Sequence, residues 1–94
     1  MAHRVTWSAR AVQDVEAIAA YISADSPAYA NAVVKRIVNL TRSLSGFPNS
    51  GRMIPEFQDP SIRELLTYSY RIMYTVRDEE VLIVAVIHGK RNLS

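Results

Sequence analysis

The N-terminal part of the chain changes from a strand-like to a helix-like spacing of apolar residues. In residues 3–7 polar and apolar side chains alternate, so that Val5 and Trp7 share one face, as in a half-buried strand. The next apolar positions follow helical spacing, and Ser8 precedes them as a typical N-cap. The pattern therefore predicts a short strand followed by a helix over about 9–24.

A second helix is predicted to begin at Ser26-Pro27, because serine caps helices and proline suits the first helical position. Gly46 and Pro48 mark its end, since glycine favours the position after a helix and proline cannot continue one. The connection between the helices is about two residues long, which favours an antiparallel hairpin. The apolar positions of this helix are too many for one stripe: Ala30, Val33, Val34, Ile37, Val38, Leu40 and Leu44. Val34 and Val38 lie to one side and form an apolar flank.

Three strand-like segments follow in the C-terminal half of the sequence, at 62–67, 70–76 and 81–88. A tight connection near Tyr68-Ser69 and a turn over 77–80 join them, and such short connections imply antiparallel pairing. The last segment is apolar on both faces, which predicts a central strand covered on both sides.

The segment 47–61 holds three of the four prolines and is expected to be an ordered surface loop. The resulting order of elements is β-α-α-β-β-β. This order predicts an α+β fold in which a helical hairpin packs on a mainly antiparallel, four-stranded sheet. A chain of 94 residues is expected to form a single domain over 1–94 with one modest core.

Composition limits the functional classes. The net charge of +2 is too small to indicate a broad nucleic-acid-binding surface. The chain has no cysteine, and His3 and His88 alone do not make a metal site, so neither a metal nor a cofactor is expected. The sequence has no apolar run of a length that spans a bilayer and no signal peptide pattern. A cytoplasmic location without a membrane partner is therefore expected.

The last predicted strand ends on a histidine, a glycine and two cations, His88-Gly89-Lys90-Arg91. Because glycine lets the backbone bend, the imidazole and both cations are expected at the rim of a rigid sheet. In an antiparallel pair, Arg71 at the start of the preceding strand falls within about two residues of being opposite His88. The sequence therefore predicts that these positive groups and the imidazole converge at one edge of the sheet.

Several short motifs occur in a fixed order within this pattern of elements. They are Ser26-Pro27, Pro48…Gly51-Arg52, Arg63-Glu64-Leu65, Tyr70-Arg71-Ile72…Tyr74 and His88-Gly89-x-Arg91. In this order and spacing, over nearly the whole chain, the sequence resembles the RelE/ParE superfamily of toxins from bacterial type II toxin–antitoxin pairs.

The resemblance implies two alternative activities. ParE-like members poison DNA gyrase, whereas RelE-like members cut messenger RNA on the ribosome with a cluster of basic residues. In a RelE-like enzyme, Arg71 and Arg91 would stabilise the scissile phosphate and His88 would transfer a proton. Residues 46–61 contain no lysine, and the sequence carries no tyrosine-bearing C-terminal extension of the kind several RelE-like nucleases use. These differences favour a ParE-like toxin, which is not an enzyme, and leave the endoribonuclease as the alternative.

The remaining basic residues near the predicted site are candidates for binding the target or another anion: Arg52, Arg63, Lys90 and Arg91. Two of the arginines also have structural alternatives. Arg71 is placed to pair with Glu64 on the neighbouring strand, and Arg52 is placed to anchor its loop. A third functional alternative is an inactive binding module of the same fold.

The resemblance also implies protein partners. A cognate antitoxin is expected to bind the chain in a hetero-oligomer, and the cellular target is DNA gyrase or, alternatively, the ribosome and its messenger RNA. The apolar flank of the second helix, Val34 and Val38, together with Tyr21, is suited to an amphipathic helix laid in a groove. These three residues are the predicted antitoxin-binding surface.

Overall fold

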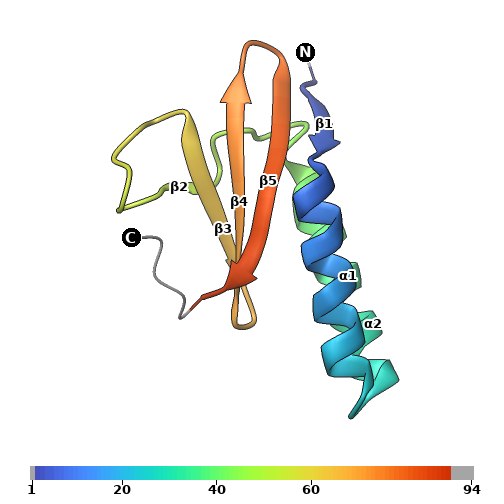
Figure 1. Cartoon of the computed structure of the whole chain (residues 1–94). Helices are drawn as coiled ribbons and strands as arrows, with labels where there is room; N and C mark the ends of the chain where they lie inside the picture. Colours follow the sequence, from blue (N-terminus) through green and yellow to red (C-terminus); the bar gives the residue numbers. More distant parts are fainter. Residues whose placement is uncertain (1, 90–94) are drawn as a thin grey trace.

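Two helices lie side by side on one face of a five-stranded sheet (Figure 1). The computed structural model describes residues 2–89 of the 94-residue chain. In chain order the elements are β1 (Arg4–Trp7), α1 (Ala9–Ser23), α2 (Pro27–Ser43), β2 (Arg52–Met53), β3 (Ile62–Thr67), β4 (Tyr70–Arg77) and β5 (Glu80–His88). The predicted α+β fold, a helical hairpin on a mainly antiparallel sheet, is confirmed, but the sheet has five strands and not four.

The additional strand, β2, lies within the segment that was predicted to be loop throughout. Its two residues pair with β3, Arg52 opposite Glu64 and Met53 opposite Arg63. Two residues are too few to show the alternation by which a strand is recognised in a sequence. The prediction of a four-stranded sheet was wrong for this reason.

The strands are ordered β1-β5-β4-β3-β2 across the sheet. Strand β5 therefore lies inside the sheet, as its continuous apolar sequence predicted. It runs parallel to β1 and antiparallel to β4, and the remaining neighbours are also antiparallel. Strand β1 is short because the chain turns into α1 immediately after Trp7, which pairs with Ile83.

Both helices begin at the predicted caps. The Ser8 hydroxyl accepts a hydrogen bond from the Ala11 N–H at 3.0 Å, and the Ser26 hydroxyl accepts one from the Tyr29 N–H at 3.1 Å. Each bond satisfies one of the backbone donors that the first turn of a helix leaves without a partner. Proline at position 27 begins α2, as expected from the Ser-Pro dipeptide.

The sheet buries apolar side chains on both faces. The core on the helix side is centred on fully buried residues of α2 and its C-cap, of β4 and of β5: Val33, Ile37, Leu44, Ile72, Tyr74, Val81 and Ile83. A smaller cluster on the other face contains Ile54, Met73, Ala85 and Ile87, and Ile54 comes from the segment between β2 and β3. Burying each of the larger side chains contributes about 1.5–3 kcal/mol. The segment after β2 therefore covers the face that the helices leave open.

A buried tyrosine fixes the chain just before β2. The Tyr74 hydroxyl donates a hydrogen bond to the Pro48 carbonyl at 2.8 Å and accepts one from the Gly51 N–H at 2.9 Å. A Cβ atom at Gly51 would lie 2.5 Å from the Tyr74 hydroxyl and 2.6 Å from the Glu64 carbonyl. Only glycine allows this close approach, and the contact sets the position from which Arg52 begins β2.

Beyond the end of β1, side chains of the α1 region contact the edge of β5. The Ser8 hydroxyl donates to the Val84 carbonyl at 2.8 Å, and Asp14 accepts the Val86 N–H at 2.9 Å. These two bonds satisfy backbone groups that a neighbouring strand would otherwise pair. Helix α1 therefore stays close to β5 along the C-terminal half of that strand.

Candidate functional site

The ends of β4 and β5 form the corner of the sheet at which the sequence predicted a site. Tyr70 lies opposite His88 and Arg71 lies opposite Ile87, so the predicted proximity of Arg71 and His88 in the register is confirmed. Residues directly opposite each other share a face of the sheet. Tyr70 packs against the core beneath the helices, whereas Ile87 belongs to the cluster on the other face. His88 and Arg71 therefore project from opposite faces.

On the face away from the helices, Arg71 is the centre of an ion cluster. Its Nε donates to Glu64 Oε1 at 2.6 Å, and its two terminal nitrogens donate to the two oxygens of Glu56 at 3.0 and 3.1 Å. The second oxygen of Glu64 accepts a bond from Arg52 Nε at 2.7 Å. The alternative interpretation of Arg71 as the ion-pair partner of Glu64 is thus confirmed.

Two of the four charged groups in this cluster are withdrawn from solvent, whereas the Arg52 side chain is 56% exposed. The Glu64 side chain is fully buried and that of Arg71 is 7% exposed, whereas the Glu56 side chain is 30% exposed. Charges are stable away from water only when they are paired and hydrogen-bonded, and two arginines here balance two glutamates. Hydrogen bonds to Arg71 hold the pKa of Glu56 below its ordinary value. The same bonds raise the pKa of Arg71, so the pair is ionised at neutral pH.

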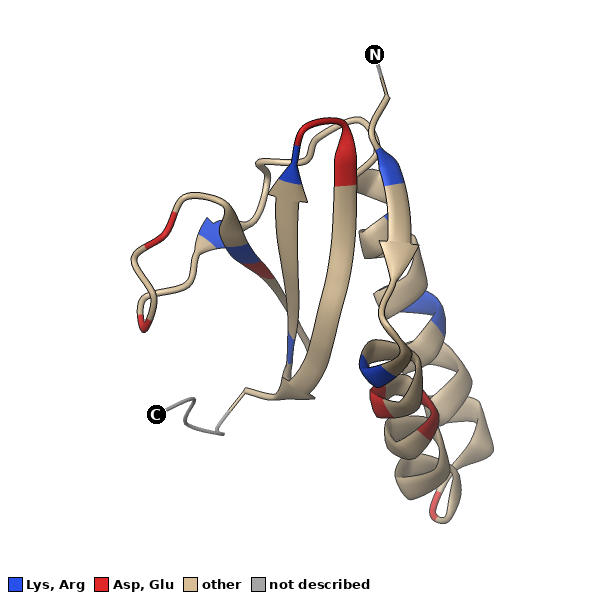
Figure 2. Cartoon of the chain, turned by 45° about the horizontal axis from the view of Figure 1, so that its top comes forward, with Lys and Arg blue, Asp and Glu red and all other residues tan. Residues whose placement is uncertain are grey.

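Two other arginines that were predicted to bind an anion, Arg52 and Arg63, form hydrogen bonds within the protein. Arg52 pairs with Glu64 across the β2–β3 contact, which is the anchoring role foreseen for it. Arg63 projects from the other face of β3 and donates to the Gly51 carbonyl at 2.9 Å. Lys90 and Arg91, which complete the predicted basic set, lie outside the described residues. The acidic turn Asp78–Glu80 lies at the other end of β5, far from this corner (Figure 2).

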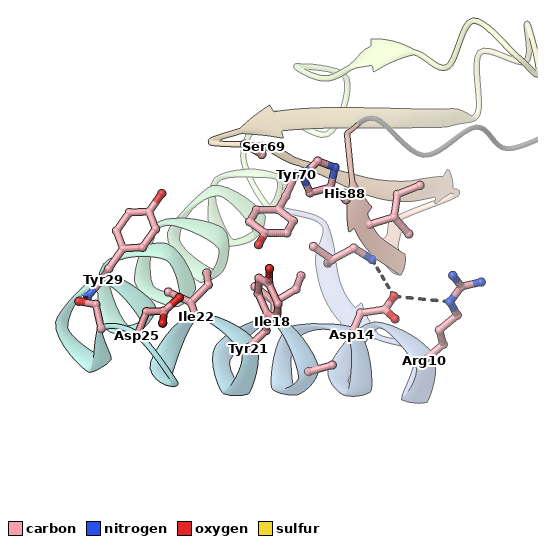
Figure 3. Close-up of a pocket in the computed structure, with 14 residues that line it drawn as sticks. Arg10, Asp14, Ile18, Tyr21, Ile22, Asp25, Tyr29, Ser69, Tyr70 and His88 are labelled. Carbon is pink, nitrogen blue, oxygen red and sulfur yellow. Dashed lines mark hydrogen bonds and ion pairs between the residues drawn. The ribbon is translucent and has the colours of Figure 1, made fainter.

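On the face beneath the helices, a groove of about 740 Å³ runs between α1 and the ends of β4 and β5. Aromatic rings line one end of it, from Tyr21, Tyr29, Tyr70 and His88, and Asp14 and Arg10 line the other end (Figure 3). The rings of Tyr70 and His88 meet edge to face, with centroids 5.8 Å apart. Tyr21, in the last turn of α1, is 79% exposed, which is high for an aromatic side chain. Such a groove is typical of a surface that receives another chain.

Metal ligation was considered for the corner within the described residues. No group of three or more histidine, cysteine, aspartate and glutamate side chains within residues 2–89 is arranged to hold a metal ion. The corner offers instead charged groups that are already paired with one another and rings that are partly open to solvent.

Comparison with known proteins bears on this arrangement. The family model described as the ParE toxin of the parDE type II toxin–antitoxin system matches residues 5–93. The chain belongs to the ParE toxin family. The match spans nearly the whole fold, from β1 to beyond the end of β5.

Two proteins named as toxins are similar to the chain over most of its length. It is 35% identical over 89 residues to the toxin RelE2 of Caulobacter vibrioides, covering 94% of this chain and 97% of that protein. It is 38% identical over 88 residues to a protein named as toxin Y4kP of Sinorhizobium fredii, covering 90% and 88%. The names of these relatives do not separate gyrase from the ribosome as the target.

The ParE fold itself is also found in a solved structure. A chain from the chromosomal ParDE toxin–antitoxin system of P. aeruginosa superposes with a TM-score of 0.75 at 23% identity, covering 94% of this chain and 97% of that chain. At this level of identity the likeness establishes the fold alone. It agrees with the order of helices and strands seen here.

The three predicted antitoxin-binding residues lie on different surfaces of the structure. Tyr21 lines the groove between α1 and β5. Val34 and Val38 are half-buried in α2 and are not among the residues that line this groove. The apolar flank of the second helix and the exposed tyrosine of the first are therefore separate features.

Two residues of the corner had no role in the sequence analysis. Glu56 completes the ion cluster, and Asp14 holds the edge of β5. Glu56 is a lone acid in a proline-rich loop, and nothing in its local sequence indicates an arginine partner. For Asp14 the sequence does offer an indication, because it is an acidic residue on α1 at a position from which its side chain can reach an adjacent strand.

Proposed function

We propose that this chain is a single-domain ParE toxin that arrests growth by binding DNA gyrase and that a cognate antitoxin neutralises it. One observation carries the choice of gyrase: the Arg71 guanidinium, on which phosphate chemistry would depend, is held by the carboxylates of Glu56 and Glu64. A toxin that acts by protein–protein contact has no need of that arginine at a reacting phosphate.

The endoribonuclease alternative requires a different arrangement of the same residues. Arg71 would have to contact a scissile phosphate while His88 transfers a proton to or from a reacting oxygen a few ångströms away. Here the two side chains belong to opposite faces of the sheet, and the His88 ring lies against Tyr70. Both residues nevertheless line one pocket of about 370 Å³, so the carboxylates that hold Arg71, and not its distance from His88, disfavour the endoribonuclease.

The groove between α1 and β5 supports the antitoxin as a partner. Its exposed rings would be covered by an apolar segment of the antitoxin, and burying aromatic side chains is a major source of affinity in protein interfaces. In this proposal Tyr21 contacts the antitoxin directly. Val34 and Val38 would be reached by a further part of the same partner on α2. The complex would be a hetero-oligomer.

The proposed place of action is the cytoplasm, where both gyrase and an antitoxin are found. Neither helix in the described part of the chain is both long and apolar enough to cross a membrane.

Two assays on the purified toxin test the choice of target. We expect inhibition of gyrase-catalysed supercoiling and no cleavage of messenger RNA in a translation reaction. His88→Ala should leave gyrase inhibition within about twofold of wild type, because the imidazole has no chemical step to perform there. Messenger RNA cleavage that His88→Ala abolishes, without gyrase inhibition by the wild-type protein, would replace the proposal with the endoribonuclease.

A further inference from the structure

The turn between β3 and β4 places a tyrosine in a backbone conformation that favours glycine. Strand β3 ends at Thr67 and β4 begins at Tyr70, so only two residues connect these paired strands. The first residue of such a connection commonly takes a positive φ, and glycine, asparagine or aspartate usually occupies it. Here it is Tyr68, with a φ of 52°. A side chain of this size is strained in the left-handed region, because its Cβ atom crowds the following carbonyl oxygen.

Neighbouring strands hold this turn, so it cannot relax on its own. Thr67 pairs with Tyr70, and the Gly89 N–H, just after β5, donates a hydrogen bond to the Ser69 carbonyl. Tyr68 is 54% exposed, so burial of its ring contributes little that would offset the strain. The stability of the chain therefore favours a smaller residue at this position.

The Tyr68 ring lies where two hollows of the surface meet. The groove of about 740 Å³ beneath the helices and the pocket of about 370 Å³ share Ser69, Tyr70 and His88 in their walls. Tyr29 lines the groove and Tyr68 lines the pocket, and their rings meet edge to face with centroids 5.8 Å apart. The aromatic end of the groove therefore continues across the hairpin as far as Tyr68.

An antitoxin is the occupant that this continuous surface fits best. The family to which the chain belongs is described as the toxin of a toxin–antitoxin system. An apolar segment of the antitoxin that lies in the groove against Tyr21 and Tyr29 would meet Tyr68 where it leaves the groove. Leu66, which is also 54% exposed and lines the same pocket as Tyr68, adds aliphatic surface there. Tyrosine rings in such positions often supply much of the affinity of a protein interface.

We propose that Tyr68 is an antitoxin-binding residue, held in a strained turn so that the rings of Tyr21, Tyr29 and Tyr68 form one continuous contact surface. The proposal rests on the antitoxin groove proposed above and extends it by a residue that lies outside that groove. Strained backbone persists where the surrounding structure fixes it, and it is concentrated at functional sites. The strain lowers the stability of the free toxin, and the complex gains the contact of one more ring.

The test separates the ring from the strain. Tyr68→Gly and Tyr68→Ala remove the same ring, but only glycine relieves the positive φ. The purified, full-length cognate antitoxin is titrated into each toxin by calorimetry, and thermal unfolding of each toxin alone measures its stability. We expect both variants to bind the antitoxin at least about tenfold more weakly than wild type. Tyr68→Gly should unfold about 4–8 °C above Tyr68→Ala, and no lower than wild type. Tyr68→Phe, which keeps the ring, should bind within about twofold of wild type.

Wild-type affinity in Tyr68→Gly would overturn the proposal, and so would equal unfolding temperatures for Tyr68→Gly and Tyr68→Ala, which would show that the turn is not strained. If Tyr21→Ala weakens antitoxin binding and Tyr68→Gly does not, this inference fails while the groove remains the antitoxin site. Gyrase inhibition by the same toxins is measured without antitoxin, so a failure of the gyrase proposal is distinguishable from a failure of this one. Loss of gyrase inhibition in Tyr68→Gly with unchanged antitoxin affinity would assign the ring to the target and overturn the proposal.

Discussion

At the corner where β4 and β5 end, the two faces of the sheet differ in the burial of their side chains. On one face, Arg71 and Glu64 are nearly or fully buried, and Arg71 pairs with Glu64 and Glu56 while Glu64 also pairs with Arg52. On the other face, Tyr70 and His88 form the wall of an open groove, and Tyr21 projects into solvent. The charged face is thus completed internally, while the aromatic face leaves apolar surface for a partner. Sequence neighbours on one strand therefore differ in their surroundings, which the charge of a residue alone does not indicate.

Removing the buried carboxylate should have the largest effect on the charged face. Glu64→Ala leaves Arg71 and Arg52 without a shared partner, and loss of one member of a buried ion pair costs about 3–5 kcal/mol in the free energy of unfolding. Urea denaturation measures the change. Glu80→Ala is the control, because its pair with Arg4 is largely exposed and such pairs contribute about 0–1 kcal/mol. Equal losses in the two variants would show that the cluster does not stabilise the charged face.

A smaller loss is expected where the chain enters β2. In Gly51→Ala the added methyl group collides with the Tyr74 hydroxyl and the Glu64 carbonyl, and overpacking of this kind costs about 1–3 kcal/mol. Thermal unfolding measures it. Gly46→Ala is the matched control, since a Cβ at Gly46 has no atom within 4 Å and should change stability little. A neutral Gly51→Ala would mean that this segment adapts freely and does not position the charged face.

The aromatic face should lose binding and keep its stability when it is changed. Tyr21→Ala removes an exposed ring from the groove, so antitoxin affinity should fall about tenfold while the unfolding free energy changes by less than about 0.5 kcal/mol. Calorimetric titration with the antitoxin measures the affinity. Phe47→Ala, which removes a ring that is 71% exposed but outside the groove, should bind as wild type does. Similar affinities for all three proteins would place the antitoxin elsewhere.

The smallest expected effect is a pH dependence of the free energy of unfolding, which arises from the charged face. Because Arg71 lowers the pKa of Glu56 from its ordinary value of 4.5, the carboxylate stabilises the fold above that value. This contribution is lost as the pH falls through the lower pKa of the folded state. Glu56→Gln should therefore lose less stability than wild type between about pH 7 and pH 3 in urea denaturation. Glu16→Gln, which removes an exposed carboxylate of α1, should follow wild type.

Local patterns were sufficient for most of the secondary structure. Serine caps, a proline at the start of α2 and the alternation in β4 are decided by contacts between neighbours in the chain, so they can be read directly. Strand β2 was missed because pairing with β3, and not its own sequence, makes it a strand. The register that brings Tyr70 opposite His88 followed from the short turn between β4 and β5, even though a bulge interrupts it at Met73 and Tyr74.

The candidate site was predictable in its position but not in its partners. Arg71 and His88 were placed at one corner by strand pairing, and that is how they lie. Glu56 and Asp14 were not foreseen, because each reaches its partner from a different element, Glu56 across a loop and Asp14 from a helix. Val34 and Val38 were grouped with Tyr21 by hydrophobicity, whereas the groove contains only the tyrosine among these three.

The sequence by itself determined the order of the elements other than β2, the caps of both helices and the burial of β5. These follow from periodicity and short-range contacts, which depend on residues a few positions apart. The family was indicated by the resemblance of its motifs. Only the tertiary structure decided that Arg71 is held by two carboxylates and that His88 lies on the other face among tyrosines. The physical reason is that the strength of a charge or the exposure of a ring depends on groups brought together from distant parts of the chain, and folding alone sets those distances.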